Sequence, residues 1–326
     1  MAISGVRRRI TSAILGAALL VAASPGVLHA GPYRAPRTAF GQPDLQGAWT
    51  NYSMTILERT PNTPLTFATR AEERAYEARM AREWSGDEAD GLGQGVSEWH
   101  PKYSMARIDG RLRTSWIVSP ADGRLPWRPE GRKRWEAITA AAKRDDATDP
   151  ERRTASDRCL MGGLGSSNPP MHNPPVSGGK LIVQTATEVA ILSEMNHDVR
   201  IVRLGGRHLP KNVRVWMGDS IGRWEGETLV VETTNFRAEE GWRNPFMISP
   251  DARVTERFTR VSPGELRYAF EVDDPATYTE VWRGEMPFLT DKAPIYEFAC
   301  HEGNYGLADI LSIARHADAA AASASR

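Results

Sequence analysis

The sequence lacks an excess of charge of either sign. Its 326 residues include 41 lysines and arginines and 41 aspartates and glutamates, so the formal net charge is zero. A nucleic-acid-binding protein needs a surplus of positive charge to engage phosphates, and this composition argues against that class of partner. Cysteine is also scarce. The chain contains two cysteines and no Cys-x-x-Cys pair, which excludes a zinc ribbon with cysteine ligands.

The signatures of several enzyme classes are missing as well. We find no phosphate-binding glycine loop with its lysine, no dinucleotide-binding fingerprint between a strand and a helix, and no Gly-x-Ser-x-Gly elbow. The glycine-rich stretch 162–167 is followed by prolines and contains no lysine, which is typical of a turn. The sequence therefore predicts no organic cofactor.

The first thirty residues have the features of a secretory signal peptide. Residues 7–9 are arginines, residues 10–23 are largely apolar, and Ala30 offers a small residue for cleavage. This apolar run is shorter than the ~20 residues that a transmembrane helix requires. No later segment is long and apolar enough either, so we expect no stable membrane insertion once the signal is removed. The predicted location is periplasmic or secreted, and the arginines also permit a twin-arginine signal.

Export changes the interpretation of the two cysteines. We predict a disulfide between Cys159 and Cys300, because two exported thiols rarely stay reduced. The bond would fix the backbone next to Cys300 and draw the segment 159–172 toward it. The alternative is a reactive thiol at Cys300 beside His301, with Cys159 free.

Three helices are predicted. The first begins at the N-cap Thr69, which has Glu72 three residues later, and runs to about Trp84. Helical spacing of apolar residues predicts a second helix over 129–144 and a third over about 305–316. The alanine-rich tail that follows is expected to fray.

From Lys180 onward the hydrophobic period is two, which is typical of strands. Turn sequences between neighbouring runs favour antiparallel pairing. About eight consecutive strands call for a closed sheet, because closure removes the edges. The predicted strands are 180–185, 189–195, 199–204, 227–236, 253–261, 265–273, 277–286 and 295–300, with a further strand-like piece at 45–50. The predicted fold class is mainly β. Residues 156–326 are expected to form an antiparallel lipocalin-like barrel with a C-terminal helix. Residues 31–155 are expected to form an irregular, partly helical region that packs on the barrel.

Two stretches of the sequence resemble motifs of a known protein family. Residues 222–236 read GRWEGETLVVETTNF, and residues 296–306 read YEFACHEGNYG. With the shorter stretches 41–49 and 194–200, they resemble a family of exported, largely uncharacterised bacterial proteins common in soil organisms. The resemblance covers most of the chain after residue 30 and implies no particular reaction. Gly47-Ala48-Trp49 also resembles the glycine-x-tryptophan opening of lipocalins.

Histidines with neighbouring acids are the candidate site residues. The candidates are His172, His197 and His301, with the acids Glu194, Asp198 and Glu302. Glu194 and His197 come close if the chain turns at Asn196. The predicted disulfide would bring the loop that carries His172 toward His301.

Three interpretations of this set remain open. A histidine–carboxylate pair can act as general acid and base near neutral pH. The three histidines can instead bind a divalent metal ion, because imidazole suits zinc, iron or copper. In the third interpretation each histidine is structural and caps a loop or pairs with a neighbouring acid.

Two mid-strand carboxylates, Glu232 and Glu256, would be buried if their strand faces point into the barrel. A buried carboxylate must pair with an arginine or stay protonated, and we favour salt bridges over catalysis here. The arginines considered as partners are Arg253, Arg257, Arg260 and Arg283. His208 follows two glycines and is expected to be a loop residue without a catalytic role.

The leading hypothesis is an exported enzyme that acts on a small, partly apolar molecule in the barrel cavity. Histidine and carboxylate would move protons in a lyase, isomerase, hydratase or hydrolase step. The alternative is a periplasmic binding or carrier protein that holds a lipophilic ligand unchanged, and a third class is a structural envelope protein without a cavity. The sequence does not indicate the oligomeric state.

Overall fold

The computed structural model describes Met1 and residues 33–84, 104–143, 147–161, 168–172, 178–238 and 245–324. Apart from Met1, the predicted signal peptide lies outside the described residues. Residues 33–326 form one compact unit, which is described here by itself. Among the described residues, no helix combines the length and the apolar character needed to cross a bilayer.

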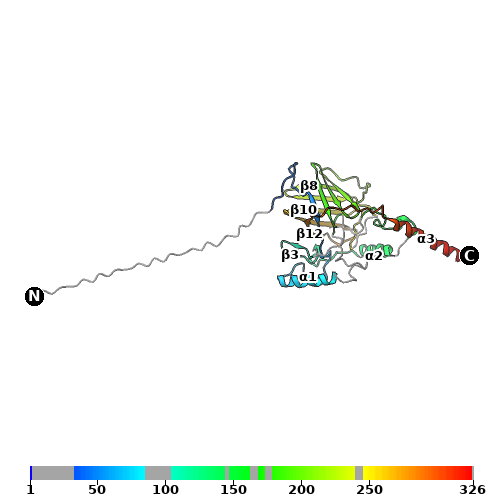
Figure 1. Ribbon diagram of the computed structural model, residues 1–326, viewed down its shortest axis with the longest axis horizontal. Helices are drawn as coiled ribbons and strands as arrows, with labels where there is room; N and C mark the ends of the chain where they lie inside the picture. Colours follow the sequence, from blue (N-terminus) through cyan, green and yellow to red (C-terminus); the bar gives the residue numbers. More distant parts are fainter. Residues whose placement is uncertain are drawn as a thin grey trace. The chain divides into compact units, whose positions relative to one another are not determined.

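Nine strands close into a barrel (Figure 1), which confirms the mainly β, lipocalin-like prediction. Hydrogen bonds between the first and last of these strands close the ring, with Trp49 opposite Thr290. Around the barrel the strands are β1 (Gly47–Thr50), β5 (Lys180–Gln184), β6 (Glu188–Ser193), β7 (Val199–Leu204), β8 (Asp219–Glu225), β9 (Thr228–Thr234), β10 (Arg253–Ser262), β11 (Glu265–Asp273) and β12 (Trp282–Thr290). The short strand β4 (Ile117–Ser119) also pairs with β12.

One pairing in the barrel differs from the prediction. Strands β7 and β8 are parallel, with Val202 opposite Ser220, whereas the other barrel pairs are antiparallel. A parallel pair needs a connection that returns to the same end of the sheet, and residues 205–218 provide it. This crossover loop begins with Gly205 and Gly206, whose φ angles of +83° and +88° suit glycine.

Two predicted strands need correction. Residues 295–300 contain no strand, and the strand predicted over 277–286 begins only at Trp282 and continues to Thr290. The sequence reading also missed β8, because residues 219–225 alternate poorly between apolar and polar residues.

The three predicted helices are present as α1 (Arg70–Trp84), α2 (Pro129–Lys143) and α3 (Tyr305–Ala324), close to their predicted positions (Figure 1). The predicted N-cap of α1 is confirmed. The Thr69 N–H donates to the Glu72 carboxylate at 2.9 Å, and the Glu72 N–H donates to Thr69 Oγ1 at 3.2 Å. Helix α3 extends to Ala324, so the tail expected to fray is helical. The remaining short elements are β2 (Arg107–Ile108), β3 (Arg111–Leu112), the 3-10 turns η2 (Pro150–Arg152) and η3 (Met195–His197).

Alternate side chains of the strands fill the barrel. On β11 the predicted inward face is confirmed, because Leu266, Tyr268, Phe270 and Val272 are all buried. Packing is tight: a Cβ added to Gly284 would lie 2.3 Å from the Phe270 ring. The core continues through apolar residues of other strands, including Trp49 and Trp282, and through Trp116, which precedes β4. An interior gap that Trp49, Lys180, Phe258 and four other side chains line has no room for a water molecule. These residues therefore do not form the expected ligand cavity.

The predicted disulfide is confirmed. Cys159 and Cys300 are bonded, and their Cα atoms lie 5.8 Å apart. Neither cysteine is free, so the alternative of a reactive thiol beside His301 is wrong. Asn304 Nδ2 donates to the Asp157 carbonyl at 2.7 Å, which attaches the chain before α3 to the same segment.

Candidate functional site

The predicted site residues around β6 and β7 lie at one tight turn. Asn196 and His197 have φ angles of +61° and +45°, so the chain does turn at Asn196, and the His197 N–H donates to the Glu194 carbonyl at 3.1 Å. His197 Nδ1 lies 2.9 Å from the carbonyl oxygen of Phe298. This contact ties the turn to the segment before the disulfide, and it gives the His197 ring a structural partner.

The other two histidines do not join His197 in a metal site. His172 is half-buried, and its ring centroid lies 6.1 Å from that of Phe246. His301 and Glu302 are exposed. Within the ranges that the structure describes, no group of three or more histidine, cysteine, aspartate or glutamate side chains is arranged to hold a metal ion. The proposed three-histidine metal site is therefore not assembled.

Glu194 and Asp198 act electrostatically on a lysine that sequence reasoning overlooked. Lys180, the first residue of β5, is 1% exposed, and its ammonium donates to the Gly178 carbonyl at 3.3 Å. Burial lowers the pKa of Lys180 to about 7, against the opposing effect of Glu194 and Asp198. The alternation of residues along β5 indicates that Lys180 is buried, because it places Lys180 on the inward face with Ile182.

Glu256 forms the buried salt bridge that the sequence predicted, with a different arginine. Arg200 of β7 contacts both carboxylate oxygens, one of them at 3.0 Å from Nη2. The Tyr268 hydroxyl donates to Glu256 Oε1 at 2.7 Å and accepts from the Met171 N–H at 2.8 Å. Burial and the adjacent Glu256 raise the pKa of Tyr268 well above its usual range. This network is buried and fastens the segment 168–172 to the barrel.

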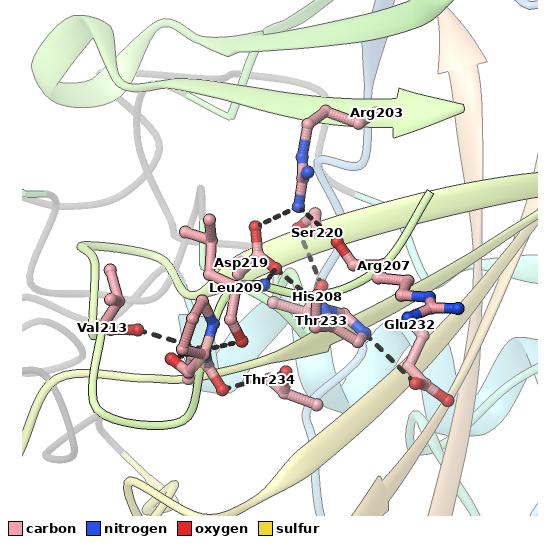
Figure 2. A network of polar contacts seen from close by, with 12 residues as sticks. Arg203, Arg207, His208, Leu209, Val213, Asp219, Ser220, Glu232, Thr233 and Thr234 are labelled. Carbon is pink, nitrogen blue, oxygen red and sulfur yellow. Dashed lines mark hydrogen bonds and ion pairs between the residues drawn. The ribbon is translucent and has the colours of Figure 1, made fainter. Parts of the chain in front are cut away.

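A second polar cluster surrounds His208 in the crossover loop, and both ring nitrogens face carboxylates (Figure 2). His208 Nδ1 lies 2.9 Å from Asp219 Oδ2, and Nε2 lies 3.2 Å from Glu232 Oε1. A carboxylate only accepts hydrogen bonds when it is ionised, so each contact forms when the ring nitrogen carries a proton. The two contacts together hold the imidazole ring between two carboxylates.

Asp219 is held more firmly than Glu232. It is the first residue of β8 and accepts from the Leu209 N–H at 2.9 Å and from Arg203 Nη2 at 2.7 Å. Although burial opposes the shift, these donors and His208 lower the pKa of Asp219. The Asp219 side chain is 7% exposed and that of Glu232 29%. Asp219 therefore orients the ring, while Glu232 is the carboxylate that a small molecule can reach.

The backbone around His208 is fixed from the other side of the loop. Asn235 follows β9, and its Nδ2 donates to the carbonyl oxygens of Leu209, Pro210 and Val213 at 3.0–3.1 Å. Side-chain bonds to three carbonyls hold the loop in one conformation. Strands β8 and β9, together with Asn235, thus position the imidazole.

The cluster forms one wall of a pocket of about 260 Å³. The lining residues are His208, Leu209, Lys211, Arg214, Glu232, Thr234, Asn235, Pro250, Asp251, Ala252 and Arg253. Two larger pockets, of 490 Å³ beside the disulfide and 860 Å³ beside Arg59, have no histidine in their lining. The His208 pocket thus combines an oriented imidazole, a reachable carboxylate and space for a ligand.

The expectation that His208 is only a loop residue overlooked this cluster. Its partners lie 11 and 24 residues away along the chain, on two different strands. Glu232 was considered only as an inward-facing carboxylate, but its side chain points outward to His208 and, at 3.8 Å, to Arg253. No local pattern could have joined these residues, because the parallel pairing of β7 and β8 brings them together.

Comparison with known proteins adds no functional assignment: no protein-family model, curated protein or solved structure matches this chain.

Proposed function

We propose that this chain is an exported enzyme that uses histidine and carboxylate acid–base chemistry on a small, partly apolar molecule in the His208 pocket. The observation that carries the proposal is His208 between Asp219 and Glu232 at the wall of a 260 Å³ pocket. General acid–base catalysis needs a proton carrier that is held in a fixed orientation within hydrogen-bond reach of the reacting group. The two ring contacts, at 2.9 and 3.2 Å, hold the His208 imidazole in one orientation beside the pocket.

The three side chains have different roles in this proposal. Asp219 fixes the tautomer and orientation of the ring through Nδ1, as buried carboxylates do for other catalytic histidines. His208 exchanges a proton at Nε2, and Glu232 is the second proton carrier or the group that the reacting molecule displaces. Such a pair can serve a lyase, isomerase, hydratase or hydrolase step, which are the reaction classes that the sequence suggested.

Two further observations support the proposal. The Cys159–Cys300 disulfide favours an oxidising compartment outside the cytoplasm, in agreement with export. The packed side chains around Lys180 inside the barrel favour a site on the barrel's outer surface. They argue against the alternative, a carrier that would hold a lipophilic ligand among those side chains.

The test compares His208→Gln with His316→Gln, a change at an exposed histidine of α3 outside the pocket. Both variants and the parent chain are incubated in D₂O with a library of small molecules, and products are identified by mass spectrometry. In D₂O, hydration adds the mass of D₂O, and hydrolysis yields two fragments that together contain it. Elimination of water lowers the mass of the substrate by that of water, and isomerisation through a carbanion incorporates deuterium. We expect the parent chain to turn over at least one compound. His316→Gln should retain this turnover, and His208→Gln should reduce it by about 100- to 10,000-fold. Full turnover in a folded His208→Gln protein would refute the proposal.

A further inference from the structure

We propose that the His208 pocket binds a compact organic monoanion whose carboxylate is held by Lys211 and Arg253. This inference rests on the function proposed above and specifies its substrate class. Some charged groups of the pocket are already engaged by the protein, whereas others retain hydrogen-bonding capacity toward a ligand.

Arg214 and Asp251 are engaged with the protein. Arg214 Nη1 donates to the carbonyl of Phe236 at 3.2 Å and to that of Pro250, and Nη2 lies 2.6 Å from Asp251 Oδ1. The two charges neutralise each other, and the backbone bonds hold the guanidinium against the wall of the pocket. Arg214 therefore has little capacity left for a ligand, and Asp251 adds no net repulsion.

Lys211 and Arg253 are differently placed. In the described part of the chain, the Lys211 side chain has no hydrogen bond or ion pair. Arg253 makes one ionic contact there, Nε to Glu232 Oε2 at 3.8 Å, which is beyond hydrogen-bond distance, and its side chain is 58% exposed. The terminal nitrogens of Arg253 and the ammonium of Lys211 are strong donors that suit a carboxylate. Both line the same pocket as His208.

The charge and size of the pocket narrow the ligand class. The lining contains three cationic side chains and two carboxylates, so its net charge is +1 when His208 is counted as neutral. One surplus charge suits a monoanion, and Glu232 would repel a second negative charge on the ligand. A water molecule takes about 30 Å³ of liquid volume, so 260 Å³ accommodates a molecule of roughly nine heavy atoms. Leu209, Pro250 and Ala252 provide apolar surface for its body.

The experiment measures binding and does not depend on turnover. Acetate and benzoate are titrated into the full chain beside acetamide and benzamide, their neutral counterparts, with His208 ring resonances followed by NMR. We expect saturable shifts with a carboxylate and a preference of about tenfold or more over its amide. Lys211→Gln/Arg253→Gln should lower carboxylate affinity about tenfold and leave amide affinity unchanged. Arg257→Gln is the matched control, because this exposed β10 arginine pairs with Glu225 and lies outside the pocket.

The outcomes separate this inference from the proposed function. Equal affinity for carboxylates and amides, no carboxylate binding, or binding insensitive to the double substitution would each overturn the monoanion assignment. His208-dependent turnover could still hold in those cases, on a neutral substrate. The assignment is supported if the double variant loses the preference for carboxylates and His208→Gln, measured by calorimetry, retains it. This holds even if the library assay finds no His208-dependent product.

Discussion

Replacing Lys180 by methionine should change how the stability of the protein depends on pH. The lysine is fully buried among apolar side chains, and burial lowers its pKa from 10.5 to about 7. Between these two values the unfolded chain binds a proton that the folded protein does not. The free energy of unfolding therefore rises with pH across this window, and below pH 7 the folded protein bears the full cost of a buried charge.

The size of the effect follows from these two pKa values. Between pH 6 and pH 9, Lys180 alone should raise the free energy of unfolding by about 2.6 kcal/mol. Methionine has a similar length and no charge, so Lys180→Met removes this term while filling most of the space. The variant should be most stabilised relative to the parent chain at the acid end of the range, because there the parent buries a charged ammonium.

Urea denaturation at pH 6, 7, 8 and 9, followed by tryptophan fluorescence, gives the free energies for both proteins. The quantity to compare is the difference between them at each pH, because the other titrating groups contribute equally and cancel. Lys133→Met, on the exposed side of α2, is the control and should show no change in this difference. A Lys180→Met difference that stays constant to within about 0.5 kcal/mol from pH 6 to 9 would refute the reasoning.

Three further changes test the packing and connections of the fold. Glu256→Gln should cost about 3–5 kcal/mol of stability by leaving a buried guanidinium unpaired, whereas Glu271→Gln, in an exposed ion pair, should cost less than about 1 kcal/mol in the same urea titration. Cys300→Ser opens a loop of 141 residues and should lower stability by about 5 kcal/mol in the chain-entropy model; a melting temperature equal to that of the parent chain would contradict it. Gly284→Ala forces a methyl group against the Phe270 ring and should cost about 1–3 kcal/mol, and an unchanged urea midpoint would show that the barrel is looser than described.

Local sequence patterns predicted most of the elements. The Thr69–Glu72 capping box fixed the start of α1, because both hydrogen bonds join residues three positions apart. The alternation of β11 placed Tyr268 and Phe270 inside for the same local reason. Where alternation was weak, as in 219–225, the strand was missed, and at 295–300 an apolar run was mistaken for one.

The candidate site was less accessible to sequence reasoning. The acids Glu194 and Asp198 were identified, but Lys180, the group that they influence, was not. For Glu256 an arginine partner was expected, yet the actual partner, Arg200, lies 56 residues away on a predicted strand whose arginine was not among the candidates. Side-chain partners across a barrel depend on register and closure, and neither is encoded in a local pattern.

The sequence by itself determined the β-rich class, the three helices and the pair of cysteines available for a disulfide, because each depends on residue type and short-range periodicity. Only the tertiary structure decided that β7 and β8 run parallel and that the crossover loop lies over β8 and β9. Hydrophobic periodicity specifies which face of a strand is buried but not which strand lies beside it. That choice of neighbour sets His208 between Asp219 and Glu232, three residues that no sequence spacing connects.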